Sequence, residues 1–394
     1  MGKQLLHTPE GVRDIYGEEY EKKLQVQSLL HQKISSYGYR DIQTPTFEFF
    51  DVFSKEIGTT PSRELYKFFD KEGNTLVLRP DFTPSIARCA AKYFMDEDMP
   101  IRFSYLGNAF TNLSDLQGKL KESTQMGVEL IGDESIYADA EIISMVIESL
   151  LNAGLRDFQV SVGNAEYFKG LCQEFHFTPD LELTLREYIS NKNYFGAEEY
   201  LLNENVEKAY REALLKTGDL IGTVDVLEKA EAIVNNERSL KAVKRLRELY
   251  DVLQLYGIEK YVSFDFGMLS KYQYYTGMIF KVYTYGVGDA IVKGGRYDSL
   301  LQKFGKDAPA VGFVILIDDL MQALSRQNTT VSLQNKRVVV VYEKEAFQKA
   351  LTFAKERRNM GYTVEMIQKE NEDCSKYEAF SARIASSELI YIKD

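Results

Sequence analysis

The sequence predicts an α+β protein with a mainly helical insert and a small α/β unit at its C-terminal end. Strand-like runs and amphipathic helices both occur before about residue 164. From about residue 164 to 257 the chain becomes rich in Glu, Lys, Leu and Tyr with a helical period. After the polar linker SRQNTTVSLQNK, strand-like and helical segments alternate, which is typical of an α/β unit with parallel strands.

The N-terminal part begins with a predicted helix over residues 17–37, which Gly38 ends. The next run, YRDIQTPTFEFFDVF, is strand-like but contains Pro45, so we expect an edge strand, a bulge or an interface. NTLVLRPDFTPSIARCAAKYF predicts a strand, a turn and a helix, with Thr83 as N-cap and Pro84 at the first helical position.

A predicted hairpin over residues 102–132 precedes a helix over 136–153. Behind the insert, strands are expected in YVSFDFGML, YYTGMIFKVYTYG and DAIVKGGRYDSLL. We expect AVGFVILIDDLMQAL, residues 310–324, to form one helix that closes the core. In the tail, RVVVVY, YTVEMI and SELIYI are predicted strands with helices between them.

Composition restricts the class of protein. A length of 394 residues suits two or three domains, and no apolar run approaches the ~18 residues of a membrane span. The segment MGKQLLHTPEGVRD lacks the apolar core of a secretion signal, and the three cysteines are far apart, so we expect a cytoplasmic protein with free thiols. No close Cys or His pairs suit zinc, and a net charge of −11 disfavours a large nucleic-acid surface.

The stretch STQMGVELIG carries the first candidate site. In a strand, side chains alternate, so Gln125, Gly127 and Glu129 share one face. Gly127 would leave room for a ligand between an amide and an acid, which suits amine or imidazole donors. A solvated strand face explains the same pattern without a ligand.

Two further stretches are open to more than one interpretation. Asp81 and Thr83 precede a helix and could simply cap it. In YYTGMIFKVY, Tyr275 and Gly277 share a face, so the phenol either borders the ligand or packs in the core. GGRYD lacks the spacing of a phosphate-binding loop, and no cofactor is expected.

The order of these motifs is more specific than any one of them. YRDIQTPTFEFFDVF, LVLRPDFT, QMGVELIG, YYTGMIF and GGRYDSLLQKFG…PAVGF follow one another as in a histidyl-tRNA synthetase, and the sequence resembles that family from about Thr8 to Leu324. The resemblance implies a class II aminoacyl-tRNA synthetase-like antiparallel sheet flanked by helices, dimeric, with the Pro45 segment near the dimer contact. The expected domains are a core over residues 1–325, with the insert at about 164–257, and a shortened anticodon-binding-like domain over 336–394.

The resemblance also implies which residues would contact histidine. The positions that match the family's histidine contacts are Asp81, Thr83, Gln125, Glu129, Tyr275 and Tyr297. Asp81 replaces a glutamate, so its side chain is shorter. No metal ligand is implied.

The positions expected to handle ATP differ from the family. Thr111, Ser270 and Asp319 stand where the family has arginines, and Leu113 where it has a glutamate. Adenylation needs preorganised cations around the transferring phosphoryl group, and losing one such donor typically costs ~10²–10³ in rate. We therefore expect no catalytic residue for amino-acid activation.

A site that keeps its histidine half and loses its ATP half resembles the regulatory subunits of ATP phosphoribosyltransferase. That family implies a non-catalytic chain that the short catalytic subunit requires in the first step of histidine biosynthesis, with L-histidine as feedback effector. The implied assembly is a homodimer within a hetero-oligomer, without membrane or nucleic acid. The alternatives are a free-standing histidine-binding or tRNA-binding paralogue and an active histidyl-tRNA synthetase.

Overall fold

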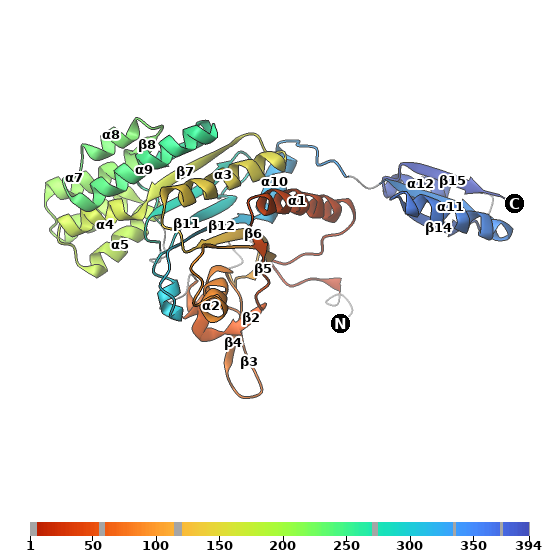
Figure 1. Cartoon of the computed structure of the whole chain (residues 1–394), viewed down its shortest axis with the longest axis horizontal. Helices are drawn as coiled ribbons and strands as arrows, with labels where there is room; N and C mark the ends of the chain where they lie inside the picture. Colours follow the sequence, from red (N-terminus) through yellow and green to blue (C-terminus); the bar gives the residue numbers. More distant parts are fainter. Residues whose placement is uncertain are drawn as a thin grey trace. The chain divides into compact units, whose positions relative to one another are not determined.

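The computed structural model describes residues 6–54, 60–113, 120–269, 275–333, 336–370 and 373–393. The chain forms two compact units (Figure 1). The first comprises Met1–Arg13 and Val26–Thr330, and the second comprises Asp14–Gln25 and Val331–Asp394. No helix among the described residues is both long enough and apolar enough to cross a lipid bilayer.

The first unit is built on one large, mainly antiparallel sheet. Its strands lie in the order β1 (Arg40–Asp41), β5 (Ile101–Phe110), β6 (Glu122–Ile131), β12 (Ala310–Leu316), β11 (Val292–Arg296), β10 (Met278–Thr284), β7 (Phe158–Asn164), β9 (Val262–Asp265) and β8 (Ile221–Gly222). Among the described strands of this sheet, only the β1–β5 and β7–β9 pairs are parallel. The predicted class II synthetase-like sheet is therefore confirmed.

The hairpin β5–β6 forms as predicted, with a continuous register from Ile101↔Ile131 to Phe110↔Glu122. One prediction next to it is wrong. Residues 310–324 do not form a single helix, because Ala310–Leu316 is the strand β12 and only Ile317–Arg326 is the helix α10. β12 pairs with β6 on one side and β11 on the other, and most of its residues are buried on either face of the sheet. A short apolar run of this kind cannot be assigned by its period alone.

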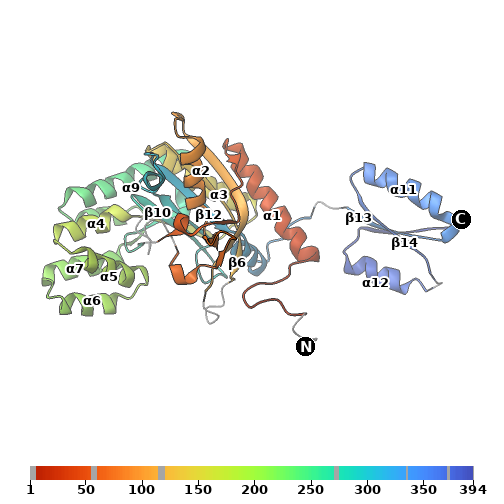
Figure 2. The ribbon, with the colours of Figure 1, turned by 90° about the horizontal axis from the view of Figure 1, so that it is seen from below.

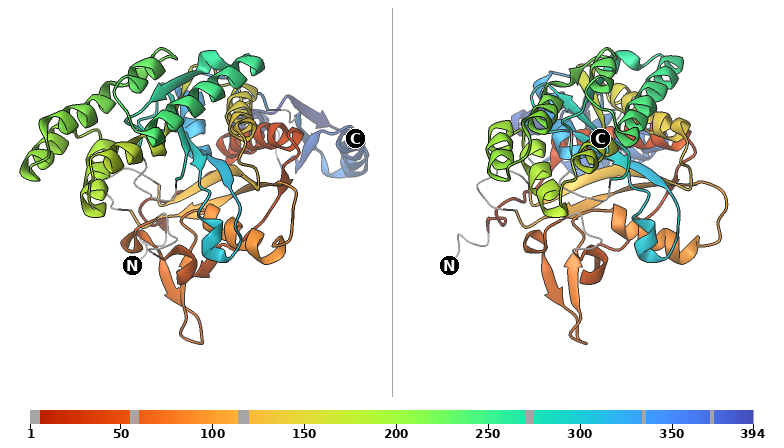
Figure 3. Two further views of the ribbon diagram at one scale, coloured as in Figure 1. Left: turned by 60° about the vertical axis from the view of Figure 1, so that its left-hand side comes forward. Right: turned by 90° about the vertical axis from the view of Figure 1, so that its left-hand side faces the viewer.

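A second, small sheet carries the segment around Pro45. It contains β2 (Phe47–Phe49), β4 (Thr75–Leu78) and β3 (Lys67–Phe69), in that order. Both views of Figure 3 show it, in orange, projecting from the main sheet. Pro45 lies between β1 and β2, each an edge strand of its own sheet, which agrees with the expectation that proline is excluded from sheet interiors.

The helices that flank the large sheet are α1 (Gly17–Ser36), α2 (Thr83–Tyr93), α3 (Ile136–Asn152) and α10. α3 begins at the N-cap Ser135, whose side chain accepts from the Ala138 N–H, and most of its residues are buried. α3 packs against β12 and against α9 of the insert. Short 3₁₀ turns occur at Phe50–Phe53, Ser62–Glu64, Thr217–Asp219, Glu259–Tyr261, Leu301–Phe304 and Lys344–Ala346.

The segment between β7 and β9 is mainly helical. It contains α4 (Ala165–Glu174), α5 (Pro179–Ser190), α6 (Tyr194–Asn203), α7 (Lys208–Lys216), α8 (Val226–Glu231) and α9 (Glu237–Tyr256). Figures 1 and 2 show these helices grouped at the β7 end of the sheet. Gly257 ends α9 in the left-handed conformation, as its place after the helical period predicted.

The second unit contains an α/β sandwich. Its elements are β13 (Arg337–Tyr342), α11 (Phe347–Asn359), β14 (Thr363–Gln368), α12 (Ser375–Arg383) and β15 (Glu388–Ile392). The strand order is β14-β13-β15 and both pairs are parallel, as predicted. Alternate valines of β13 pack with α11 on one face and with Tyr377 of α12 on the other, so each helix covers one face (Figure 2).

Candidate functional site

One face of the large sheet is almost bare of side chains where its central strands meet. Across the register, Glu129 pairs with Gly312, Gly312 with Gly295, Gly295 with Ile279, and Ile279 with Gly163. Directly paired residues share a face of a sheet. We call this the glycine face; it is the face on which Glu129 stands.

Glu129 is the central group of the site. Only 1% of its surface is exposed. Oε1 accepts a 2.7 Å hydrogen bond from the Thr83 hydroxyl, and Oε2 accepts one from the Tyr297 hydroxyl. Burial raises the pKa of Glu129 to about 8, against these two hydrogen bonds and with help from nearby Asp81. The carboxyl therefore carries a proton over most of the neutral range, which is unusual for a structural glutamate and typical of a functional one.

Gly312 makes room for this carboxyl. A Cβ at Gly312 would collide with Glu129 Oε2 and with the Val128 carbonyl oxygen. Glu129 therefore leans from β6 over β12, toward the middle of the sheet. No larger residue at position 312 is compatible with this arrangement.

The space above Gly127 is filled by the protein itself. The hydroxyl and ring of Tyr105, the cross-strand partner of Gly127, occupy the place where a side chain at position 127 would stand. The expectation that Gly127 leaves room for a ligand to lie on the strand is therefore wrong. Burial, followed by the charges of Glu129 and Asp81, raises the pKa of Tyr105 well above its usual value. Tyr105 is thus a neutral hydroxyl beside Glu129.

Asp81 and Thr83 have different roles from those expected. Thr83 is not the N-cap of α2, because the helix begins at Thr83 and Phe82 precedes it. The Thr83 N–H donates to Asp81 Oδ1 at 3.1 Å, so Asp81 performs the capping. This leaves the Thr83 hydroxyl to bond Glu129. The capping and ligand interpretations are both compatible with this geometry.

The two tyrosines approach the site from other strands. Tyr297 follows β11 and is buried, and burial together with Glu129 raises its pKa well above the usual value. The Tyr275 ring lies over Gly295, 2.7 Å from where a Cβ there would stand. Gln125 is half-buried farther along β6, where its Nε2 is 3.4 Å from Ser123 Oγ. The fold thus joins Thr83, Glu129 and Tyr297 directly and leaves Gln125 outside that cluster.

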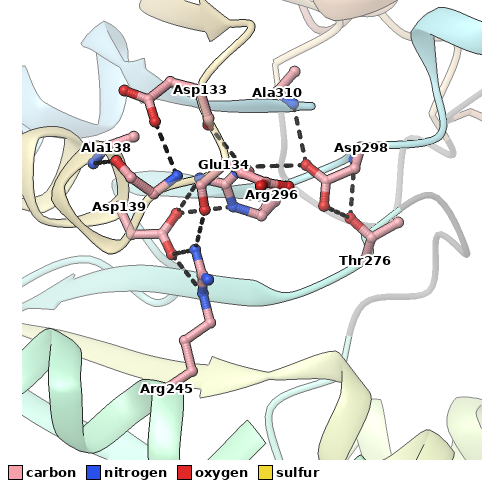
Figure 4. A network of polar contacts seen from close by, with 10 residues as sticks. Asp133, Glu134, Ala138, Asp139, Arg245, Thr276, Arg296, Asp298 and Ala310 are labelled. Atoms are coloured by element: carbon pink, nitrogen blue, oxygen red, sulfur yellow. Dashed lines mark hydrogen bonds and ion pairs between the residues drawn. The ribbon is translucent and has the colours of Figure 1, made fainter. Parts of the chain in front are cut away.

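A buried ionic network supports the tyrosines from the opposite face (Figure 4). Asp139 of α3 is fully buried; its Oδ1 accepts two bonds from Arg296, at 2.7 and 2.9 Å, and its Oδ2 accepts two from Arg245 of α9, at 2.7 and 3.0 Å. Arg296 also bonds Asp298, which accepts from the Thr276 hydroxyl at 2.8 Å. Because Arg296 and Asp298 flank Tyr297, and Thr276 follows Tyr275, this network fixes the backbone that carries both tyrosines.

The resemblance implies arginines at Thr111, Ser270 and Asp319, and the structure describes two of these positions and the neighbouring Asp318. Thr111 is half-buried, and its N–H donates to the Lys121 carbonyl. Asp318, in the first turn of α10, accepts from the Thr124 N–H at 2.8 Å, so it extends the β6–β12 ladder with a carboxylate. Asp319 is half-buried next to it. Ser270 lies outside the described residues.

Sequence reasoning missed Tyr105, Phe82 and Arg79. The Phe82 and Tyr105 rings stack at 4.4 Å between centroids, and the Arg79 guanidinium lies 4.0 Å from the centre of the Phe82 ring. A signal for Tyr105 existed, because an aromatic residue often covers a glycine across a hairpin. Finding it required the register of β5 with β6, which the loop between them did not reveal.

A metal centre has no support in the described part of the chain, where no three His, Cys, Asp or Glu side chains are grouped to hold an ion. Cys172 is buried, whereas Cys89 and Cys374 are partly buried, and all three are free thiols. Burial raises the pKa of the Cys89 and Cys172 thiols. The thiols Cys89 and Cys172 are therefore protonated and unreactive at neutral pH.

The sequence is similar to histidyl-tRNA synthetases and to ATP phosphoribosyltransferase regulatory subunits. The sequence profile of the histidyl-tRNA synthetase family matches residues 11–320. An ATP phosphoribosyltransferase regulatory subunit from Ruminiclostridium cellulolyticum is 39% identical over 396 residues, covering 100% of this chain and 94% of that protein. One from Acetivibrio thermocellus is 40% identical, covering 93% of this chain and 88% of that protein.

Solved structures agree with these relatives. A Bacillus halodurans protein described as an ATP phosphoribosyltransferase regulatory subunit/histidyl-tRNA synthetase has a TM-score of 0.88 at 32% identity, covering 99% of each chain. A histidyl-tRNA synthetase from Nostoc has a TM-score of 0.83 at 20% identity, covering 99% of this chain and 92% of that one. The second likeness concerns the fold alone.

Proposed function

The chain belongs to the ATP phosphoribosyltransferase regulatory subunits, within the histidyl-tRNA synthetase family, and we propose that it is a non-catalytic subunit that a short catalytic chain requires for activity. The catalytic chain would join ATP to phosphoribosyl pyrophosphate in the first step of histidine biosynthesis. The observation that carries this proposal is the 39% identity to a regulatory subunit over the whole chain.

The site supports a role without amino-acid activation. Thr111 and Asp319 occupy positions where the synthetase resemblance implies arginines. Asp318 adds a fixed carboxylate at the end of β6. A carboxylate near a nucleotide triphosphate opposes its binding, and the charge that develops in adenylation lacks a cationic partner on these residues.

The same chain is proposed to bind L-histidine as effector. The neutral Glu129 carboxyl would pass its proton to the imidazole and then accept the imidazolium N–H, since a carboxylate has about four acceptor positions and Thr83 and Tyr297 use two of them. Tyr275, over Gly295, would border the ring. Asp81 and Gln125 would hold the α-amine.

The assembly is proposed to be a cytoplasmic hetero-oligomer built on homodimers of this chain. Phe47 and Phe49 on the outer face of the small sheet are 52% and 55% exposed. Phe68 of β3 packs edge-on against Phe47, with ring centroids 5.8 Å apart, and extends the same apolar face. An apolar aromatic face of this kind suits burial against a second copy.

The test combines this chain with the short catalytic chain. Both are co-expressed, separated by gel filtration and assayed for phosphoribosyl-ATP, with and without histidine. We expect co-elution, turnover by the complex that far exceeds that of the catalytic chain alone, and inhibition by histidine. Glu129→Gln should reduce the ratio of uninhibited to inhibited rate.

Two outcomes would contradict the proposal. Separate elution with an unchanged rate of the catalytic chain would remove the regulatory role. Histidine-dependent exchange of pyrophosphate into ATP by the purified chain would identify an active synthetase instead. Lys303→Gln, a change at an exposed lysine of the same unit, serves as control and should leave elution and inhibition unaltered.

A further inference from the structure

Two lysines stand side by side on the glycine face. Lys281 of β10 and Lys293 of β11 are direct cross-strand partners. Lys293 lies two residues from Gly295, and Lys281 two residues from Ile279, the partner of Gly295. Both therefore project from the face that carries Glu129.

This pairing is unfavourable by itself. Like charges directly opposite each other destabilise an antiparallel pair. Burial, followed by the charge of Lys293, lowers the pKa of Lys281. A local arrangement that opposes folding without an evident structural gain is expected at functional sites.

The surrounding acids offset the charge only in part. Lys293 Nζ is 3.3 Å from Asp289 Oδ2, and both side chains are about two-fifths exposed. Lys192, from the loop between α5 and α6, pairs with Asp265 at 3.0 Å. Within the described residues Lys281 has no hydrogen-bond or ion-pair partner. These three lysines and two aspartates together therefore carry one net positive charge.

The opposite end of the site is acidic. Glu129 and Asp81 offer carboxyl groups to an imidazole and an ammonium, but a zwitterion also brings a carboxylate. Lys293 stands two residues farther along the sheet than the Glu129 row, about 6.6 Å at ~3.3 Å per residue, and two strands across it, about 9.6 Å at ~4.8 Å per strand. Glu129 leans toward β11, which shortens the lateral separation. A histidine held at Glu129 would span part of this separation, and an extended lysine side chain would span the rest.

We propose that Lys281 and Lys293 form an anion subsite on the glycine face that holds the α-carboxylate of the bound histidine. This inference rests on the histidine pocket proposed above. In this proposal the Lys293 ammonium contacts the histidine carboxylate directly. Lys281, whose positive charge has no paired acid among the described residues, attracts the carboxylate to the subsite. Gln125, on the other side of β12, would then flank the α-carbon from β6.

The experiment compares two ligands that differ at the carboxylate. The full chain is titrated by calorimetry with L-histidine and with histidinol, in which a hydroxymethyl group replaces the carboxylate. Wild type should bind histidine roughly ten- to hundredfold more tightly, the scale of a hydrogen bond to a charged group. The double variant Lys281→Gln/Lys293→Gln should bind both ligands with the affinity that wild type has for histidinol, whereas Lys303→Gln should match wild type.

Folding is monitored in the same variants. Removing the repulsion between paired lysines should leave the thermal midpoint of Lys281→Gln and Lys293→Gln unchanged or raised. Equal histidine affinity in wild type and double variant overturns the subsite while the histidine pocket stands. Absence of histidine binding to wild type overturns both. Inorganic phosphate that binds wild type, requires the lysines and is not displaced by histidine assigns the subsite to a free phosphate and overturns the carboxylate assignment.

Discussion

Replacing Glu129 with glutamine should stabilise the protein at neutral pH. The folded-state pKa of Glu129 is about 8, against an ordinary 4.5. As pH rises above 4.5, the unfolded chain releases this proton first, so the folded state loses stability until pH passes 8. Each pH unit in that window is worth about 1.4 kcal/mol, so the loss is about 3 kcal/mol at pH 7 and about 5 kcal/mol above pH 8.

Glu129→Gln keeps the shape of the protonated acid and, like it, has one acceptor oxygen and one donor, but it cannot ionise. Its free energy of unfolding should therefore equal that of wild type near pH 4.5, exceed it by about 3 kcal/mol at pH 7, and exceed it by about 5 kcal/mol at pH 8.5. Urea unfolding followed by far-ultraviolet circular dichroism at these three values measures the difference, which suits a chain with no tryptophan. A gain of this size would be unusual, because most substitutions at a buried site lower the free energy of unfolding.

Glu166→Gln is the matched control with the opposite sign. Burial acts to raise the pKa of Glu166, but Arg238 and Lys169 outweigh it and leave the pKa lowered. Wild type therefore gains stability above the ordinary pKa, and Glu166→Gln should be less stable at pH 7. A Glu129→Gln difference that is the same at pH 5 and pH 8.5, or that favours wild type at pH 8.5, would refute the raised pKa.

Three further predictions follow from single contacts. Asp139→Asn leaves the buried Arg296 and the partly exposed Arg245 without their carboxylate and should cost about 3–5 kcal/mol, measured by thermal unfolding; an unchanged midpoint would contradict the network. Gly312→Ala places a methyl group against the Glu129 carboxyl and should weaken histidine binding about tenfold or more, at an overpacking cost of about 1–3 kcal/mol, whereas Gly288→Ala, with open space around it, should have no effect. Phe49→Glu should convert the proposed homodimer to a folded monomer in light scattering, and a persistent dimer would exclude this face.

Much of the scaffold could be predicted from local patterns. The period-2 alternation of STQMGVELIG correctly placed Gln125, Gly127 and Glu129 on one face, because β6 lies between two antiparallel neighbours. The sequence also predicted the β5–β6 hairpin, the C-terminal parallel sheet and the end of α9 at Gly257. Each depends on residues close together in sequence.

The rest depended on contacts between distant residues. Asp139 and Arg296 are 157 positions apart, so no local pattern links them. Tyr105 covers Gly127 only in the observed register. The raised pKa of Glu129 follows from its complete burial. The alternating pattern of β6 predicted the face on which Glu129 stands but not that this face is covered. These are the features that make the face a site rather than a polar strand.

The features of the glycine face share one property, which is that each opposes folding. A buried acid with a raised pKa, a paired row of lysines and a floor of glycines all lower the stability of the empty protein. A ligand that brings an imidazole to Glu129 and a carboxylate to the lysines would relieve the first two at once. Such a ligand stabilises the folded protein by an amount that rises with the logarithm of its concentration divided by its Kd. Because Arg296 and Asp298 tie this face to α3 and α9, occupancy can alter how rigidly the insert is held, and a partner that contacts the rigid form would sense histidine without touching it.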